Sequence, residues 1–133
     1  PKTMQQKIKI YKNVVEDIKK IFKQKLKQID KAKIPQNKIW FDPGIGFGKN
    51  LKQNLLILKN IKKFKLKKCG LLLGSSKKSW ISGIDDSPVE KRIGGSIASV
   101  LYCLNQGVDI FRVHDVFEIQ QAIRVYKRIT CLR

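Results

Sequence analysis

The sequence predicts an α/β fold in which parallel strands alternate with helices, and two observations carry this prediction. Three short apolar runs, at residues 38–42, 70–74 and 108–114, have the length and composition of buried strands. Segments with apolar residues three and four positions apart precede, separate and follow these runs, as amphipathic helices do. Strands separated by helices pair in parallel through right-handed crossovers. Three strands with four helices fit either a small open sheet or the back half of an eightfold barrel.

The first predicted helix covers residues 10–29 and presents a lysine-rich outer face. It ends before Pro35, because proline disfavours the helical conformation of the residue that precedes it. The strand at 38–42 follows and ends on Asp42. A loop with three alternating glycines comes next, at 43–49. A strand, a glycine loop and a helix are the arrangement with which α/β proteins build ligand sites at the carboxyl ends of strands.

The later elements carry their own start and stop signals. A second amphipathic helix is expected over residues 51–61. A capping box that opens at Ser87, with proline at the first helical position, predicts a third helix that ends at residue 104. Its small residues at 94–99 imply close packing against a neighbour, and Asp115 is expected to cap the last helix. The side chains expected to face inward are Ile93, Ile97, Val100, Leu101 and Leu104 on the third helix, and Val116, Ile119, Ile123 and Tyr126 on the last.

Composition limits the classes of protein to which the chain can belong. At 133 residues it can form one modest core, and no apolar run is long enough to span a bilayer. The formal net charge is +19, but it comes mainly from lysines on polar helix faces without interleaved aromatic residues. We therefore expect no dedicated nucleic-acid binding, although a non-catalytic basic module that binds nucleic acid stays a distant alternative.

The cysteines and the start of the chain point to a reduced compartment. Cys69, Cys103 and Cys131 form no C-x-x-C pair and are odd in number, so we expect ordinary thiols in a cytoplasmic protein without a membrane anchor. The polar start has no apolar segment typical of a signal peptide. It also lacks an initiator methionine, so we expect the chain to be a later part of a longer one.

Polar side chains follow each predicted strand at its carboxyl end. Asp42 ends the first strand, Ser76 and Lys78 follow the second, and Arg112 and His114 lie at the end of the third. Residues two apart in a strand point to the same side, so the last two are expected to grip one anion together. These groups predict a substrate with an anionic leaving group and, near the carboxylate, a heterocycle edge that donates hydrogen bonds.

Two further points bear on this predicted site. Phe47, on the glycine loop, offers a wall against which a ring can lie, and Lys78 can bridge the acidic and basic ends. The alternative is that the charged residues at the strand ends pair with one another in salt bridges and bind no ligand.

Three stretches of the sequence resemble, in order and spacing, signature stretches of dihydropteroate synthase: residues 42–50, 74–79 and 112–116. The opening residues 1–5 are similar to the end of that family's motif after its fifth strand. The resemblance implies a (β/α)8 TIM barrel, of which residues 1–133 form the C-terminal portion of a single pterin-binding domain. A close alternative with the same architecture is a pterin-binding methyltransferase domain.

The resemblance also implies a reaction and a set of site residues. The family condenses 6-hydroxymethyl-7,8-dihydropterin diphosphate with 4-aminobenzoate to 7,8-dihydropteroate and releases pyrophosphate, as part of folate biosynthesis. Mg²⁺ is its expected cofactor. The resemblance assigns Asp42 and Lys78 to the pterin, Arg112 and His114 to the diphosphate, and Phe47 and Ser76 to the aminobenzoate, with Lys78, Arg112 and His114 also acting in catalysis.

The sequence departs from the family in two respects. Lys77 stands where the family usually has arginine, which keeps the charge but loses the planar donor fork. The family's upstream half, with its Mg²⁺ ligand, has no counterpart here, so we expect no metal ligand in this chain and no activity from it alone. Family members are often homodimers through their late helices, and the resemblance implies the same partner for this chain.

Overall fold

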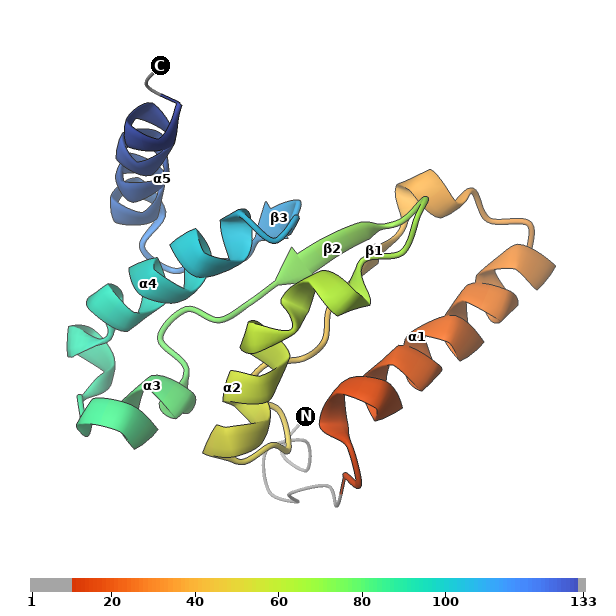
Figure 1. Ribbon diagram of the computed structural model, residues 1–133, viewed down its shortest axis with the longest axis horizontal. Coiled ribbons are helices and arrows are strands. Elements are labelled where there is room, and N and C mark those ends of the chain that lie inside the picture. The colour runs from red at the N-terminus through yellow and green to blue at the C-terminus, as the bar shows by residue number, and fades with distance from the viewer. Residues whose placement is uncertain (1–10, 132–133) are drawn as a thin grey trace.

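The computed structural model describes residues 11–131, and its alternation of helices with parallel strands is the one predicted (Figure 1). Within this range, the strands β1 (Trp40–Phe41), β2 (Gly70–Leu73) and β3 (Ile110–Phe111) form one parallel sheet in the order β1-β2-β3. The helices of the same range are α1 (Val14–Lys31), α2 (Leu51–Lys59), α3 (Ser79–Asp85), α4 (Ile93–Leu104) and α5 (Val116–Thr130), and the short 3-10 turns are η2 (Gln36–Lys38), η3 (Ile61–Phe64) and η4 (Val89–Lys91).

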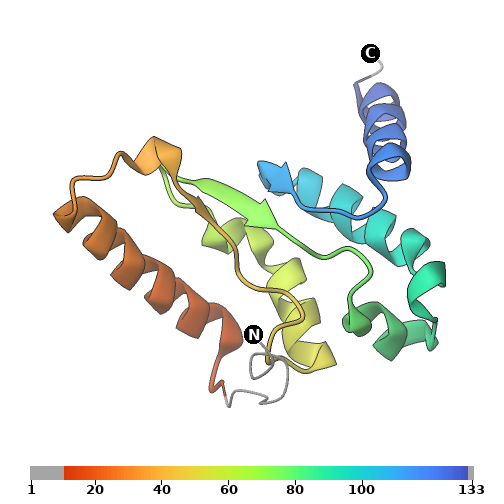
Figure 2. The ribbon, with the colours of Figure 1, turned by 180° about the vertical axis from the view of Figure 1, so that it is seen from behind.

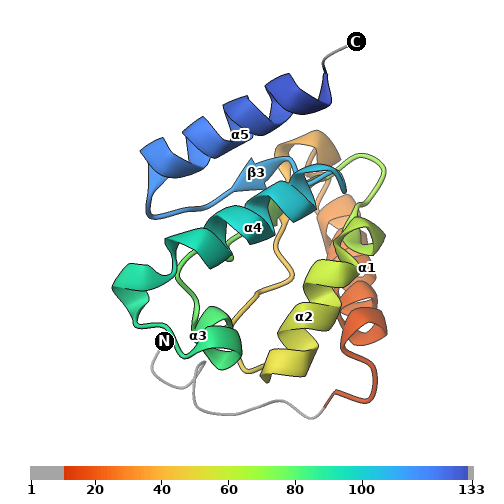
Figure 3. The same ribbon diagram turned by 60° about the vertical axis from the view of Figure 1, so that its left-hand side comes forward.

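The helices cover one face of the sheet. Seen from behind, no helix of the described residues passes in front of the strands (Figure 2). The two faces differ in burial as this arrangement requires: Leu71 and Leu73 are fully buried, whereas Trp40 and Ile110 on neighbouring strands are 48% and 38% exposed. Helix α5 lies against α4 and projects from the rest of the chain (Figure 3). The sheet therefore has one covered face and one open face.

The core lies between α1, α2 and the covered face of the sheet. Its centre is aromatic: the Phe22 ring lies 4.7 Å from the Phe41 ring and 5.9 Å from the Phe64 ring, measured between centroids. Offset and edge-on arrangements of this kind are favoured between aromatic rings. Helix α1 begins at Val14, four residues after the predicted start, where Asn13 caps it. Helix α2 begins at Leu51 as predicted, and Asn50 forms a reciprocal capping box with Gln53 there.

Asp109 fixes the alignment of β3 on β2 just before β3 begins. Its carboxylate accepts a hydrogen bond from the Leu71 N–H at 2.6 Å and pairs with Lys65, and its own N–H donates to the Leu71 carbonyl. The hydrogen bond from Lys65 and that from Leu71 hold the pKa of this carboxyl below its usual value. Alignment at this point decides which residues after β2 stand opposite which residues after β3.

Several predicted boundaries are wrong. The first and third strands are two residues long, not five and seven, and α3 was not predicted at all. The capping box at Ser87 does not start a helix: its hydroxyl is buried without a partner among residues 11–131, and the turn η4 follows it. Helix α4 begins later, at Ile93, and the Arg92 guanidinium just before it donates to the Ser87 and Lys77 carbonyls.

The inward faces of the last two helices were predicted only in part. Val100 on α4 and Ile119 on α5 are buried, but Val116 is 62% exposed. The α4 residues Ile93, Ile97 and Leu101 are only half-buried, since they line an open groove of about 460 Å³ whose other wall is α5. The cysteines are free, as expected, and Cys69 and Cys103 are buried.

The small residues of α4 do allow close packing, against α3. A Cβ atom at Gly95 would stand 2.6 Å from Cγ2 of Ile81, a side chain that is only 3% exposed. We expect Gly95→Ala to lower the free energy of unfolding by about 1–3 kcal/mol, because overpacking a tight contact has costs of this size. Gly94 is the matched control, since nothing lies within 4 Å of an added Cβ there.

The urea midpoints of the two variants test this contact. Gly94→Ala should be neutral or up to about 1 kcal/mol more stable, because alanine is the better helix former. Equal midpoints for Gly94→Ala and Gly95→Ala would show that α3 and α4 do not pack as described.

Candidate active site

The predicted site residues follow the carboxyl ends of the strands, and parallel pairing brings those ends to one edge of the sheet. Asp42 directly follows β1, residues 75–78 follow β2, and residues 112–115 follow β3. Side chains at this edge of a parallel sheet are the usual builders of ligand sites in α/β proteins.

The glycine loop after β1 needs its glycines for conformation. Gly44, Gly46 and Gly48 have φ values of +72°, +80° and +58°, in the left-handed region that other residues avoid. The Asp42 carboxylate starts the loop by accepting the Gly44 N–H at 2.8 Å. Lys49 folds back over it and donates to the carbonyls of Gly44 and Phe47, at 2.8 and 3.0 Å.

Asn54 supports the loop from α2, and the sequence did not indicate this role. Its side chain is 3% exposed; it accepts the Gly46 N–H at 2.8 Å and donates to the carbonyls of Lys49 and Asn50. A single polar residue within an amphipathic helix is normally read as solvent-facing. The one available signal was its position on the first turn of a helix that directly follows a glycine loop.

Lys78 lies at the centre of the site. Its Nζ stands 4.0 Å from the centroid of the Phe47 ring, a cation–π contact, and its stem fills the space beside Gly46, where a Cβ would approach Lys78 Cδ to 3.1 Å. Burial lowers the pKa of the Lys78 ammonium, the Arg112 charge lowers it further, and the Asp42 charge opposes both. The structure thus brings the charges of Asp42, Lys78 and Arg112 within electrostatic reach of one another.

His114 and Ser76 form a second contact across the site. The Ser76 Oγ lies 3.1 Å from His114 Nδ1 and accepts the His114 backbone N–H at 3.3 Å. Ser76 is 2% exposed, so its hydroxyl faces His114 and not solvent. Ser76 was also expected near a helix start; α3 begins three residues later, at Ser79, whose side chain is exposed.

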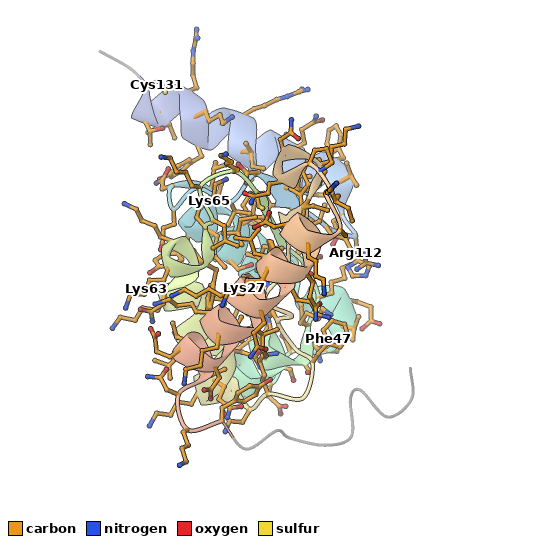
Figure 4. The ribbon with its side chains drawn as sticks, turned by 90° about the vertical axis from the view of Figure 1, so that its right-hand side faces the viewer. Lys27, Phe47, Lys63, Lys65, Arg112 and Cys131 are labelled. Atoms are coloured by element: carbon orange, nitrogen blue, oxygen red, sulfur yellow. The ribbon has the colours of Figure 1, made fainter. Side chains whose placement is uncertain are left out.

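Arg112 is held by its backbone. Its N–H donates to the Leu73 carbonyl at 2.9 Å, and its side chain is exposed on the same side of the molecule as Phe47 (Figure 4). Because β3 ends at Phe111, strand alternation does not by itself orient Arg112 and His114. Their placement rests on the effect of Arg112 on Lys78 and on the contact of His114 with Ser76.

The four charged residues of the predicted site do not pair with one another, which was the alternative to a ligand site. Among residues 11–131, no ion pair joins any two of Asp42, Lys78, Arg112 and His114. The ion pair at this edge is the one between Lys77 and Asp115, whose nitrogen and oxygen are 2.6 Å apart. Asp115 makes no side-chain cap on α5, contrary to the prediction.

No three His, Cys, Asp or Glu side chains within residues 11–131 gather closely enough to hold a metal ion. In the same range, no helix is long and apolar enough to cross a membrane.

Residues 1–114 match the family described as "Pterin binding enzyme". The chain belongs to this family. Among curated relatives of the pterin-binding family, the dihydropteroate synthase of Escherichia coli is 38% identical over 125 residues, which are 94% of this chain and 44% of that protein. The dihydropteroate synthase of Haemophilus influenzae is 35% identical over 127 residues, 96% of this chain and 46% of that protein.

Solved structures show the same relationship for the fold. The Yersinia pestis dihydropteroate synthase in complex with a sulfonamide drug superposes with a TM-score of 0.88 at 32% identity, over 98% of this chain and 47% of that one. The Xanthomonas albilineans enzyme with 4-aminobenzoic acid gives 0.91 at 26% identity, over 98% and 48%. A structure of that enzyme with 7,8-dihydropteroate gives 0.88 at 26% identity, over 93% and 48%. The pterin-binding chain described here spans about half the length of these relatives, and its fold is that of half a (β/α)8 barrel.

Proposed function

We propose that residues 1–133 form the C-terminal part of a cytoplasmic dihydropteroate synthase. The proposed reaction joins 6-hydroxymethyl-7,8-dihydropterin diphosphate to 4-aminobenzoate, forms 7,8-dihydropteroate and releases pyrophosphate. The observation that carries this proposal is that the Lys78 ammonium lies 4.0 Å from the Phe47 ring and within electrostatic reach of Asp42 and Arg112, at one edge of the sheet. The ligands 4-aminobenzoic acid and 7,8-dihydropteroate, bound by the Xanthomonas albilineans relative, support the choice of substrates.

Each group has a chemical role in the proposed reaction. The Asp42 carboxylate accepts hydrogen bonds from the amino-pyrimidine edge of the pterin, and Lys78 contacts the pterin ring. Arg112 and His114 hold the diphosphate, whose departure breaks the bond to the methylene carbon. The amine of 4-aminobenzoate then attacks that carbon and loses a proton. Catalysis in this scheme is positioning together with stabilisation of the leaving anion.

The aminobenzoate subsite is proposed beside the same lysine. Phe47 forms its wall, where the ring already packs against the Lys78 ammonium at 4.0 Å. Ser76 is proposed to meet the carboxylate, and to do so its hydroxyl has to exchange part of its contact with His114 for the ligand. Mg²⁺ is proposed as a requirement of the complete enzyme, with ligands from upstream residues, and no step above depends on it.

The open face of the sheet supports a further proposal, that residues 1–133 are inactive without upstream strands. Trp40 and Ile110 are exposed on that face, and the outer edges of β1 and β3 are unpaired within the described residues. The test compares residues 1–133 alone with a chain in which an upstream half-barrel precedes them, by following pyrophosphate release in the presence of 4-aminobenzoate. Turnover only in the longer chain is expected. Soluble, monomeric and active material from residues 1–133 alone would refute the requirement.

Removing the Arg112 guanidinium should weaken the binding of the diphosphate substrate. Hydrogen bonds to charged groups contribute about 1.5–3 kcal/mol each, so we expect Arg112→Ala in the longer chain to raise the dissociation constant at least tenfold. Titration calorimetry measures this directly. Arg124→Ala, at an exposed position on α5, is the control and should bind as the parent does. Equal affinities of the two variants would remove Arg112 from the site.

We also propose that the complete enzyme is a homodimer through its late helices. The groove between α4 and α5 supports this proposal, because it exposes apolar side chains to solvent. Val125 and Ile129 are 54% and 64% exposed, and a contiguous apolar patch of this kind often marks an interface between proteins. Analytical ultracentrifugation of the longer chain decides between a dimer and a monomer, and Ile129→Glu should give the monomer.

A further inference from the structure

An ion pair between Lys77 and Asp115 continues the pairing of β2 with β3 beyond the ends of both strands. Within the sheet, paired residues of these strands are 38 positions apart. The hydrogen bonds between Ser76 and His114 have the same separation, and so does the next link, from Lys77 Nζ to Asp115 Oδ1 at 2.6 Å. Side-chain contacts therefore keep the same residue pairing in the segments that follow β2 and β3, which contain the site residues.

The backbone of Lys77 is fixed as firmly as its side chain. Its φ is +54°, a left-handed conformation that is strained for lysine and persists only where surrounding contacts hold it. Its N–H donates to Ser96 Oγ at 3.0 Å, and its carbonyl accepts from Arg92 Nη1 at 3.2 Å. The sharp turn at Lys77 directs the neighbouring Ser76 toward His114, while Lys78 extends toward Phe47.

Lys77 is the ion-pair partner of the Asp115 carboxylate. The side chains of the two residues are 20% and 24% exposed, so solvent shields the pair only in part. The second carboxylate oxygen of Asp115 is buried and has no hydrogen-bond partner among residues 11–131. Removal of the ammonium would leave a partly buried carboxylate uncompensated, and the segment after β3 would have to move to hydrate it.

We propose that Lys77 and Asp115 are positioning residues, whose ion pair locks the segment after β2 to the segment after β3. The pair thereby sets where Lys78 stands relative to Arg112 and His114. Neither residue is assigned a contact with substrate. The consequence for catalysis rests on the proposed function, whereas the consequence for the geometry of His114 does not.

The imidazole of His114 reports this geometry without any assay of activity. His114 is the only histidine in the chain, so its ring gives one set of NMR signals, and their nitrogen shifts follow the hydrogen bond at Nδ1. We expect Lys77→Asn to move these signals to the positions found in Ser76→Ala, in which the contact is deleted. Asparagine tolerates the left-handed conformation, so this change removes the ammonium without adding backbone strain.

Matched variants separate the ion pair from other effects. Lys33 is also left-handed, with φ of +56°, and is exposed at the end of α1, so Lys33→Asn should leave the His114 signals unchanged. Lys77→Arg should keep the parent signals, and Asp115→Asn should change them as Lys77→Asn does, with no further change in the double variant. Parent signals in folded Lys77→Asn or Asp115→Asn would overturn the proposal.

A further variant tests the proposal if the single variants do not fold. The reversed pair Lys77→Asp with Asp115→Lys keeps opposite charges at the two positions, and aspartate tolerates the left-handed conformation. If the single variants do not fold, the reversed pair is expected to fold with parent His114 signals. Failure of the reversed pair to fold, or altered signals in it, would contradict the locking role.

Kinetics of the longer chain complete the test. Lys77→Asn should lower kcat/KM for the diphosphate substrate about tenfold, Lys77→Arg should recover most of it, and Lys33→Asn should have no effect. Parent kcat/KM in Lys77→Asn would overturn the catalytic consequence. If the parent longer chain shows no turnover, the proposed function fails, while the His114 signals still decide whether the pair positions the site.

Discussion

Replacing Lys78 by alanine in the longer chain is expected to lower the rate of pyrophosphate release at least tenfold. Lys78 interacts with three other residues of the site. Its ammonium lies over the Phe47 ring, and the charges of Arg112 and Asp42 shift its pKa in opposite directions. Alanine removes both the proposed contact with the pterin and the packing beside Gly46. Steady-state kinetics with both substrates measures the loss, and Lys59→Ala, at the exposed end of α2, is the control.

The alkaline limb of the rate gives an independent check on Lys78. Because its pKa is lowered by burial and by Arg112, the ammonium should be lost at a lower pH than an ordinary lysine, and activity should fall there. Arg112→Ala removes a charge that lowers this pKa, so the limb should move to higher pH in that variant. An unchanged limb in Arg112→Ala, or parent rates in Lys78→Ala, would show that Lys78 is not at the reacting centre.

Asp42→Asn is expected to lower the rate at least tenfold while leaving the fold intact. The amide oxygen of asparagine can still accept the Gly44 N–H, so the turn that starts the glycine loop is kept. The amide nitrogen, however, presents donors to a pterin edge that itself donates, and the buried donors lose their partner. We expect a raised KM for the pterin substrate together with an unchanged melting temperature.

The control and the pH dependence sharpen the Asp42 test. Asp86→Asn changes an exposed aspartate at the end of α3, whose left-handed φ of +54° asparagine tolerates, and should behave as the parent. Because the Asp42 charge raises the pKa of Lys78, its removal should move the alkaline limb to lower pH, opposite to the effect of Arg112→Ala. Parent KM and kcat in Asp42→Asn would exclude it from the pterin pocket.

The sequence was sufficient for the fold class and for the edge at which the site lies. Alternating strands and helices require parallel pairing. Parallel pairing brings the residues after each strand to one edge of the sheet, regardless of the conformation of the loops. This is why Asp42, Lys78 and Arg112 could be placed near one another without coordinates. The tie between Ser76 and His114 was not predicted, since it depends on a separation of 38 residues that only the sheet register reveals.

Features that depend on tertiary contacts were mispredicted or missed. Helix α3 has seven residues and contains Gly83, too short and too weak a pattern to recognise. The capping box at Ser87 does not form: the chain makes a 3-10 turn there, and Arg92 donates to the carbonyls of Ser87 and Lys77. Asp115 satisfies the rule for a helix cap, but Lys77 offers it an ion pair instead. At Asp115 a partner distant in sequence overrode a local preference.

The glycine loop after β1 is tied down before any substrate arrives. Asn54 holds it from α2, and Lys49 bridges two of its carbonyls. If a ring binds against Phe47 as proposed, this loop loses little conformational freedom on binding, so it can discriminate between ring shapes without the entropic cost of ordering a mobile segment.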